Sequence, residues 1–154
     1  MRYFDDMKVG DHFDMGAYTF SQDAILAFRK LHDPLPVFGA DDSEGRVCAS
    51  GLHVASVQMR LLILDLQRET EERRKAGLDI AVNGPSPGVR DISWPHPVYA
   101  GDTMSVSRVL IEMRASASRK GWGLTTFQSM GINQHGQTVL LVKGTGFLPL
   151  RPQS

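Results

Sequence analysis

Two small residues at the entry to a long apolar segment, Ser50 and Gly51, stand where this chain could do chemistry. The run over residues 52–66 is apolar almost all the way round and predicts one long helix over residues 48–75, entered through a small-residue turn. The first turn of a helix leaves backbone N–H groups without partners, and small residues let another molecule approach them. Such an N-terminus can hold an anion or a negative charge that develops during a reaction. We therefore expect the functional site at this helix entry.

Three further side chains lie near this entry or at the end of another predicted helix. His53 falls in the first turn, where the helix dipole lowers its proton affinity, so it could act as a neutral base. A buried histidine bonded to backbone is the commoner role for such a residue. Cys48 has no basic neighbour adjacent in sequence, so we interpret it as a small apolar side chain at the entry rather than a nucleophile. Asp33 precedes Pro34, and these residue types alone indicate a turn.

The elements that position these residues follow from periodicity and turn signals. Ser21 is the expected N-cap of a helix over residues 22–31, and a loop rich in proline, glycine and acidic residues follows over 33–45. Alternating patterns and turn residues predict strands over residues 17–20, 89–94, 103–112, 122–132 and 137–148. One apolar helix and consecutive antiparallel strands predict an α+β domain in which the sheet curls round the helix and largely encloses it.

Composition sets the outer bounds. The 154 residues fit a single domain, residues 1–154, without a linker. Seventeen basic and seventeen acidic residues give no field to recruit nucleic acid or an anionic membrane, and the apolar helix is too short and interrupted for a membrane span. The N-terminal segment lacks an apolar signal core and there is one cysteine, which together suit the cytoplasm. No two of the five histidines have metal-ligand spacing, so we expect no metal.

The order of these parts resembles the hotdog fold, and the residues resemble its MaoC-like acyl dehydratases and (R)-specific enoyl-CoA hydratases. The similar segments cover nearly the whole chain: YFDDMKVGDHF, SQDAILAFRKLHDP, VCASGLH and VRDISWPHPVYAGDTMSV. The resemblance implies reversible hydration of a 2-enoyl thioester carried by coenzyme A or an acyl carrier protein, within fatty acid metabolism. It implies no cofactor, because coenzyme A is part of the substrate, and at least a homodimer.

The resemblance also assigns roles to residues. Asp33 takes the position of the catalytic base, and the Gly51 backbone N–H that of the oxyanion donor, with Ser50 and His53 as secondary candidates. The family places a histidine five residues after the aspartate, where this chain has Phe38, which cannot transfer a proton.

Phe38 leaves three functions open. The first is an impaired hydratase, and the second is a thioesterase that uses Asp33 as base or nucleophile. The third is a binding protein whose acyl-CoA pocket is lined by Phe38 and Cys48. Arg114, Arg119 and Lys120, in a predicted hairpin connection, could clamp the phosphates of coenzyme A, but charged hairpin tips that contact only solvent are commoner.

Overall fold

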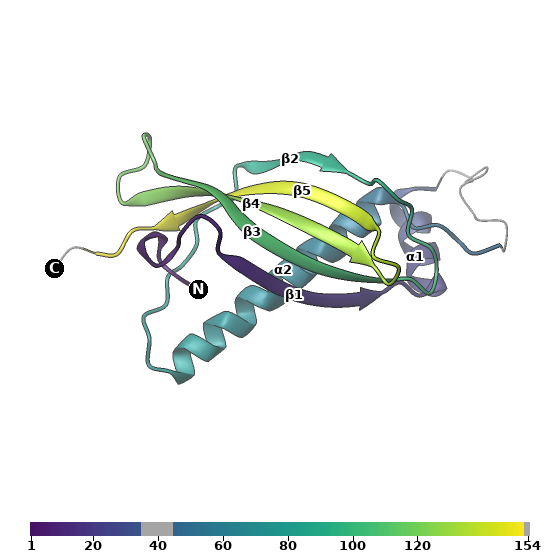
Figure 1. Ribbon diagram of the computed structural model, residues 1–154, viewed down its shortest axis with the longest axis horizontal. Helices are drawn as coiled ribbons and strands as arrows, with labels where there is room; N and C mark the ends of the chain where they lie inside the picture. Colours follow the sequence, from purple (N-terminus) through teal and green to yellow (C-terminus); the bar gives the residue numbers. More distant parts are fainter. Residues whose placement is uncertain (35–44, 153–154) are drawn as a thin grey trace.

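A five-stranded antiparallel sheet curls round one long helix in the computed structural model, which describes residues 1–34 and 45–152 (Figure 1). The strand order across the sheet is β1-β3-β4-β5-β2. The elements are a 3-10 turn (Phe4–Asp6), β1 (His12–Thr19), α1 (Gln22–His32), α2 (Gly51–Lys75), β2 (Gly88–Ser93), β3 (Thr103–Ala115), β4 (Trp122–Asn133) and β5 (Thr138–Pro149). The four predicted strands of the second half are confirmed with small shifts at their ends.

Strand β1 is longer than the predicted 17–20 because its sequence carries turn signals inside the strand. Gly16 has φ 91°, and Asp14 Oδ1 accepts a hydrogen bond from the Gly16 N–H at 2.8 Å. The pairing register with β3 shifts between these two residues, so they form a bulge rather than a turn. The strand continues through the bulge and buries Met15 against the core.

Helix α2 lies against the concave inner face of the sheet (Figure 1). The sheet covers only one side of it, where Val54, Val57 and Leu61 join the core. The prediction that α2 would be largely enclosed is wrong for the single chain, because one apolar face remains exposed. The exposed side chains on that face are Leu52, Met59, Ile63 and Leu64, with exposed fractions of 44–63%.

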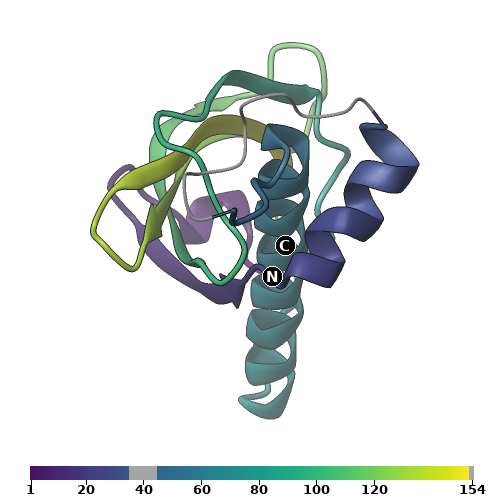
Figure 2. The same cartoon turned by 90° about the vertical axis from the view of Figure 1, so that its right-hand side faces the viewer.

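Helix α1 packs beside the N-terminal end of α2 (Figure 2). Ser21 is its N-cap as predicted, since the Ser21 Oγ accepts a hydrogen bond from the Ala24 N–H at 3.2 Å. Ile25 is fully buried, and the Phe28 ring stacks on the His53 ring of α2 with centroids 4.6 Å apart. This stack fixes the last turns of α1 against the first turn of α2.

The entry to α2 is an extended segment rather than helix. Cys48 pairs with Tyr99 in an isolated antiparallel bridge, and the Ala49 N–H donates to the Val98 carbonyl at 2.8 Å. The predicted helix start at residue 48 is therefore three residues too early. Asp102, which is 4% exposed, accepts a hydrogen bond from the Tyr99 N–H at 2.8 Å and so holds the partner segment in place.

Candidate functional site

The N-terminus of α2 is left open within the part of the chain that the structure describes. The Ser50 side chain makes no capping hydrogen bond. The first N–H of the helix with a backbone partner is that of Val54, which donates to the Ser50 carbonyl at 3.1 Å. The N–H groups of Gly51, Leu52 and His53 thus remain available to an oxygen that carries negative charge.

An aromatic side chain covers one face of Gly51. A Cβ atom built on Gly51 would lie 2.8 Å from two indole atoms of Trp94, Cδ2 and Cε2. Real Cβ atoms do not approach that closely, so glycine is needed at position 51 while the indole holds its place. Trp94 follows β2 and is 39% exposed, and its ring forms a wall beside the open helix end.

Asp33 lies at the same end of the molecule. It is the C-cap of α1, with its backbone N–H donating to the Arg29 carbonyl at 2.9 Å. The end of α1 and the start of α2 are neighbours in both views (Figures 1 and 2). The half-buried Asp33 carboxylate has no protein partner among the described residues. The structure thus brings Asp33 to the end of the fold that also holds Cys48, Ser50, Gly51 and His53.

His53 is buried without a polar partner for one ring nitrogen. Its residue is 7% exposed, its ring stacks on Phe28, and it meets the Phe20 ring edge-on at 5.4 Å. The Nδ1 atom is buried and has no hydrogen bond, and burial lowers the pKa of the imidazole below its usual 6.5. His53 is therefore neutral at pH 7 and lines a small surface hollow with Tyr18 and Arg60.

The burial of His53 predicts a pH-dependent stability. The unfolded chain takes up a proton at this residue at a higher pH than the folded chain does, so stability falls as the pH drops below about 6.5. Replacing His53 by phenylalanine keeps the stacked ring and removes this loss, which for one group is at most about 1.4 kcal/mol per pH unit. Urea unfolding of both proteins at pH 7.5 and 5.5 measures the difference. A stability difference between them that is equal at the two pH values would contradict the assignment.

Of the remaining predicted site residues, one lies near the entry of α2, two lie far from it, and one lies outside the described residues. Cys48 is half-buried in the extended entry, with its Sγ 3.6 Å from the Ala49 carbonyl oxygen. Phe38 lies outside the described residues. Arg119 and Lys120 are exposed in the β3–β4 hairpin, at the opposite end of the sheet (Figure 1). Strand β3 alone spans roughly 40 Å, so one chain does not bring them to Gly51.

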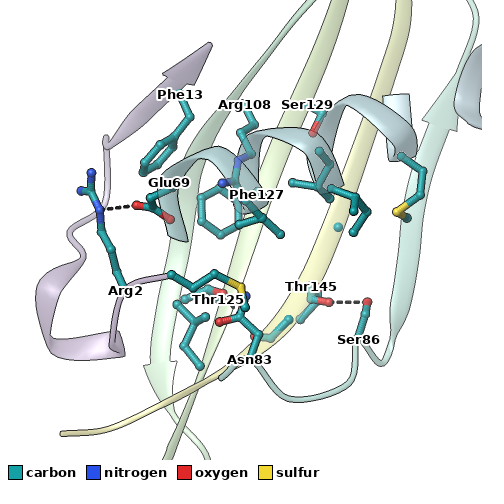
Figure 3. A pocket seen from close by; sticks show the side chains of 18 of the residues that line it. Arg2, Phe13, Glu69, Asn83, Ser86, Arg108, Thr125, Phe127, Ser129 and Thr145 are labelled. Carbon is teal, nitrogen blue, oxygen red and sulfur yellow. Dashed lines mark hydrogen bonds and ion pairs between the residues drawn. The ribbon is translucent and has the colours of Figure 1, made fainter. Parts of the chain in front are cut away.

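A large cavity was not predicted. It lies between α2 and the inner face of β3, β4 and β5, with a volume near 800 Å³ (Figure 3). Arg108 of β3 lines it and is 9% exposed, with its Nη2 atom 3.4 Å from Asp65 Oδ2. Burial lowers the pKa of Arg108, and the Asp65 carboxylate opposes that shift. Asn83 Oδ1 also lines the cavity and is buried without a partner.

The sequence holds a signal for this arginine. Met104, Val106 and Leu110 alternate on the buried side of β3, and Arg108 takes the same parity. A charged residue at an inward position of an alternating strand needs a partner or a polar cavity.

Neither a metal site nor a membrane-spanning helix is found among residues 1–34 and 45–152. No group of three or more histidine, cysteine or acidic side chains could hold a metal ion there. No helix in this part of the chain is long and apolar enough to cross a bilayer.

Comparison with known sequences gives one curated relative. No protein-family model matches the chain. Mesaconyl-CoA hydratase of Haloarcula marismortui is 29% identical over 65 residues, which are 42% of this chain. The match spans only 18% of the length of that hydratase.

Solved structures match over the full length. A MaoC-like dehydratase from Rhodospirillum rubrum superposes with a TM-score of 0.77 at 28% identity, covering 99% of this chain and 100% of that one. Rv0216 from Mycobacterium tuberculosis, described as a double hotdog fold, gives a TM-score of 0.68 at 21% identity and covers 99% of this chain and 46% of that one. The predicted hotdog fold and the resemblance to MaoC-like dehydratases are confirmed.

Proposed function

Since the chain has the hotdog fold and resembles MaoC-like dehydratases, we propose that it binds an acyl thioester at the N-terminus of α2 and catalyses reversible hydration of a 2-enoyl group. The observation that carries this is the open first turn of α2 at the same end of the fold as the Asp33 carboxylate, which has no partner among the described residues. The dehydratase of Rhodospirillum rubrum and the mesaconyl-CoA hydratase of Haloarcula marismortui support the reaction class. The acyl group would be carried by coenzyme A or an acyl carrier protein.

The proposed reaction uses two groups of this chain. The Asp33 carboxylate takes a proton from water as the water oxygen bonds to C3 of the enoyl group. Negative charge then moves to the thioester oxygen, where the Gly51 N–H donates to it. The proton returns from Asp33 to C2, which completes the addition of one water molecule. The Ser50 hydroxyl, which makes no capping bond, and the neutral His53 would lie next to these groups.

A homodimer is part of this proposal. The edge strand β2 is exposed along its whole length, and α2 exposes an apolar face. An unpaired edge and an uncovered apolar face beside each other are surfaces that a second copy can cover.

The proposal is tested with a panel of trans-2-enoyl-CoA esters of different chain lengths. Loss of the absorbance of the conjugated thioester reports hydration, and release of free thiol reports hydrolysis. We expect absorbance loss without thiol, abolished in Asp33→Asn and retained in the control Asp23→Asn, which removes a carboxylate from the other end of α1.

The competing functions give different results in the same assay. If free thiol is released and this release is lost in Asp33→Asn, the protein is a thioesterase rather than a hydratase. Saturable binding of acyl-CoA with neither reaction, across the panel, would leave a binding protein.

A further inference from the structure

We propose that the cavity between α2 and the sheet is a second binding site, for an aliphatic molecule with one carboxylate, whose carboxylate binds Arg108. The site is separate from the open end of α2. Asp65, the partner of Arg108, lies fourteen residues after Gly51, which is about 21 Å along the helix. The residues of α2 that line the cavity begin at Gln58. The inference therefore does not rest on the proposed hydration.

Arg108 has hydrogen-bonding capacity that the protein does not use. A guanidinium has five N–H donors, and in the described structure Arg108 makes one hydrogen bond, to Asp65 Oδ2 at 3.4 Å. Its Nε atom is buried without a partner. The guanidinium carbon lies 4.8 Å from the Phe13 ring centre and 4.7 Å from that of Phe127, contacts that hold the group in place. The Nε atom is enclosed, so a ligand in the cavity would reach the guanidinium through its terminal nitrogens. Unpaired donors of a charged group favour an oxygen ligand there.

The charges around Arg108 leave room for one anion. Asp65 is shared between Arg108 and Arg68, and Glu69 pairs with Arg2 at 2.6 Å. These three guanidinium groups and two carboxylates carry one net positive charge, and the other charged side chains that line the cavity, Glu71 and Arg74, pair with each other at 3.1 Å. Figure 3 shows Arg108 and the Arg2–Glu69 pair around the same cavity. A single carboxylate would balance the cluster and accept hydrogen bonds from the unused donors.

The rest of the cavity suits an aliphatic body. Helix α2 contributes Leu62 and Leu66 and, where the cavity opens to solvent, Ile63 of its exposed face, and β5 contributes Gly144 and Gly146. These two glycines stand opposite Phe127 and Thr125 of β4.

Neither packing nor backbone conformation requires these two glycines. A Cβ atom built on either one would meet no atom within 4 Å, and neither has a positive φ. Their effect is to keep the cavity open.

Calorimetric titration of the intact protein tests the proposal with three ten-carbon probes below their micelle concentrations: decanoate, 1-decanol and decyltrimethylammonium. We expect saturable binding of decanoate, and binding of the other two weaker by at least about tenfold because they cannot accept charge-assisted bonds from Arg108. If decanoate shows no saturable binding, the proposal is wrong. That is the result expected if a second copy of the chain occupies the cavity. Equal binding of decanoate and decanol would also overturn the proposal.

Two variants locate the site. Gly144→Val places a side chain inside the cavity from a position that has space for it, so the variant should fold and bind decanoate more weakly. Arg108→Met should lose the preference for decanoate over decanol. The control is Gln128→Val, which places the same side chain on the other face of β4, since its neighbours Phe127 and Ser129 line the cavity.

Gly144→Val keeps the test decisive should Arg108→Met fail to fold. Unchanged decanoate binding by a folded Gly144→Val protein would overturn the assignment. The titration needs no turnover, so its outcome is distinct from that of the hydration assay.

Discussion

Replacing Phe38 by histidine is expected to raise the rate of enoyl-thioester hydration by about 10²–10⁴-fold, the usual contribution of one general acid or base. Position 38 is five residues after Asp33, where the resemblance to MaoC-like hydratases implies a histidine that works with the aspartate. In the proposed reaction, with phenylalanine there, Asp33 alone would take the proton from water and return it to carbon. An imidazole shares that work, because it changes protonation state near neutral pH. Initial rates of absorbance loss, at saturating enoyl-CoA, measure the gain.

Two controls test whether the gain from Phe38→His comes from the imidazole acting together with Asp33. Phe38→Leu keeps an apolar side chain and should leave the rate unchanged. The double variant Phe38→His/Asp33→Asn should lose the gain, because the pair acts together. Equal rates for the histidine and leucine variants would show that position 38 does not face the reacting atoms in this chain.

Replacing Asp65 by alanine is expected to destabilise the fold by about 3–5 kcal/mol, the usual result of removing one partner of a buried ion pair. Asp65 and Arg108 are 7% and 9% exposed, and Asp65 Oδ2 accepts the one hydrogen bond that Arg108 makes in the described structure. Without Asp65 the guanidinium would stay in the core with no directly bonded carboxylate. Urea unfolding at pH 7.5 measures the loss.

The matched control is Asp79→Ala, which removes a carboxylate with a 74% exposed side chain from its pair with Arg151. Exposed pairs contribute little because water screens them, so this variant should unfold near the wild-type midpoint. The double variant Asp65→Ala/Arg108→Met should recover part of the lost stability, since the unpaired charge goes too. A loss from Asp65→Ala no larger than that from Asp79→Ala would contradict the buried pair.

The strands were predictable because their signals are local. Alternation and turn residues indicated β2 to β5 almost to their ends. The exact start of α2 was not predictable, because the extended conformation of Cys48 depends on its bridge to Tyr99, fifty-one residues later in the chain.

The buried face of α2 could not be read from periodicity either. A helix apolar nearly all round gives no preferred side, and the sheet decides which side is covered. Gln58 and Asp65 are buried while Met59 and Ile63 are exposed.

The functional residues also fall into those that the sequence predicted and those that it did not. Asp33 and Gly51 could be marked from local sequence and family resemblance, and the fold places both at one end of the molecule. The cavity at Arg108 could not, because its walls come from α2 and three strands and its space comes from side chains that Gly144 and Gly146 lack. A missing side chain leaves no positive signal in a sequence.

The contact between Trp94 and Gly51 has an evolutionary consequence. Because the indole occupies the space that a side chain at position 51 would need, the two positions are not free to vary independently. A relative that carries alanine or serine at the position of Gly51 should carry a smaller or displaced residue at that of Trp94. Gly51 and Trp94 are forty-three positions apart in the chain, so this linkage comes from the fold and would appear as paired substitution across related sequences.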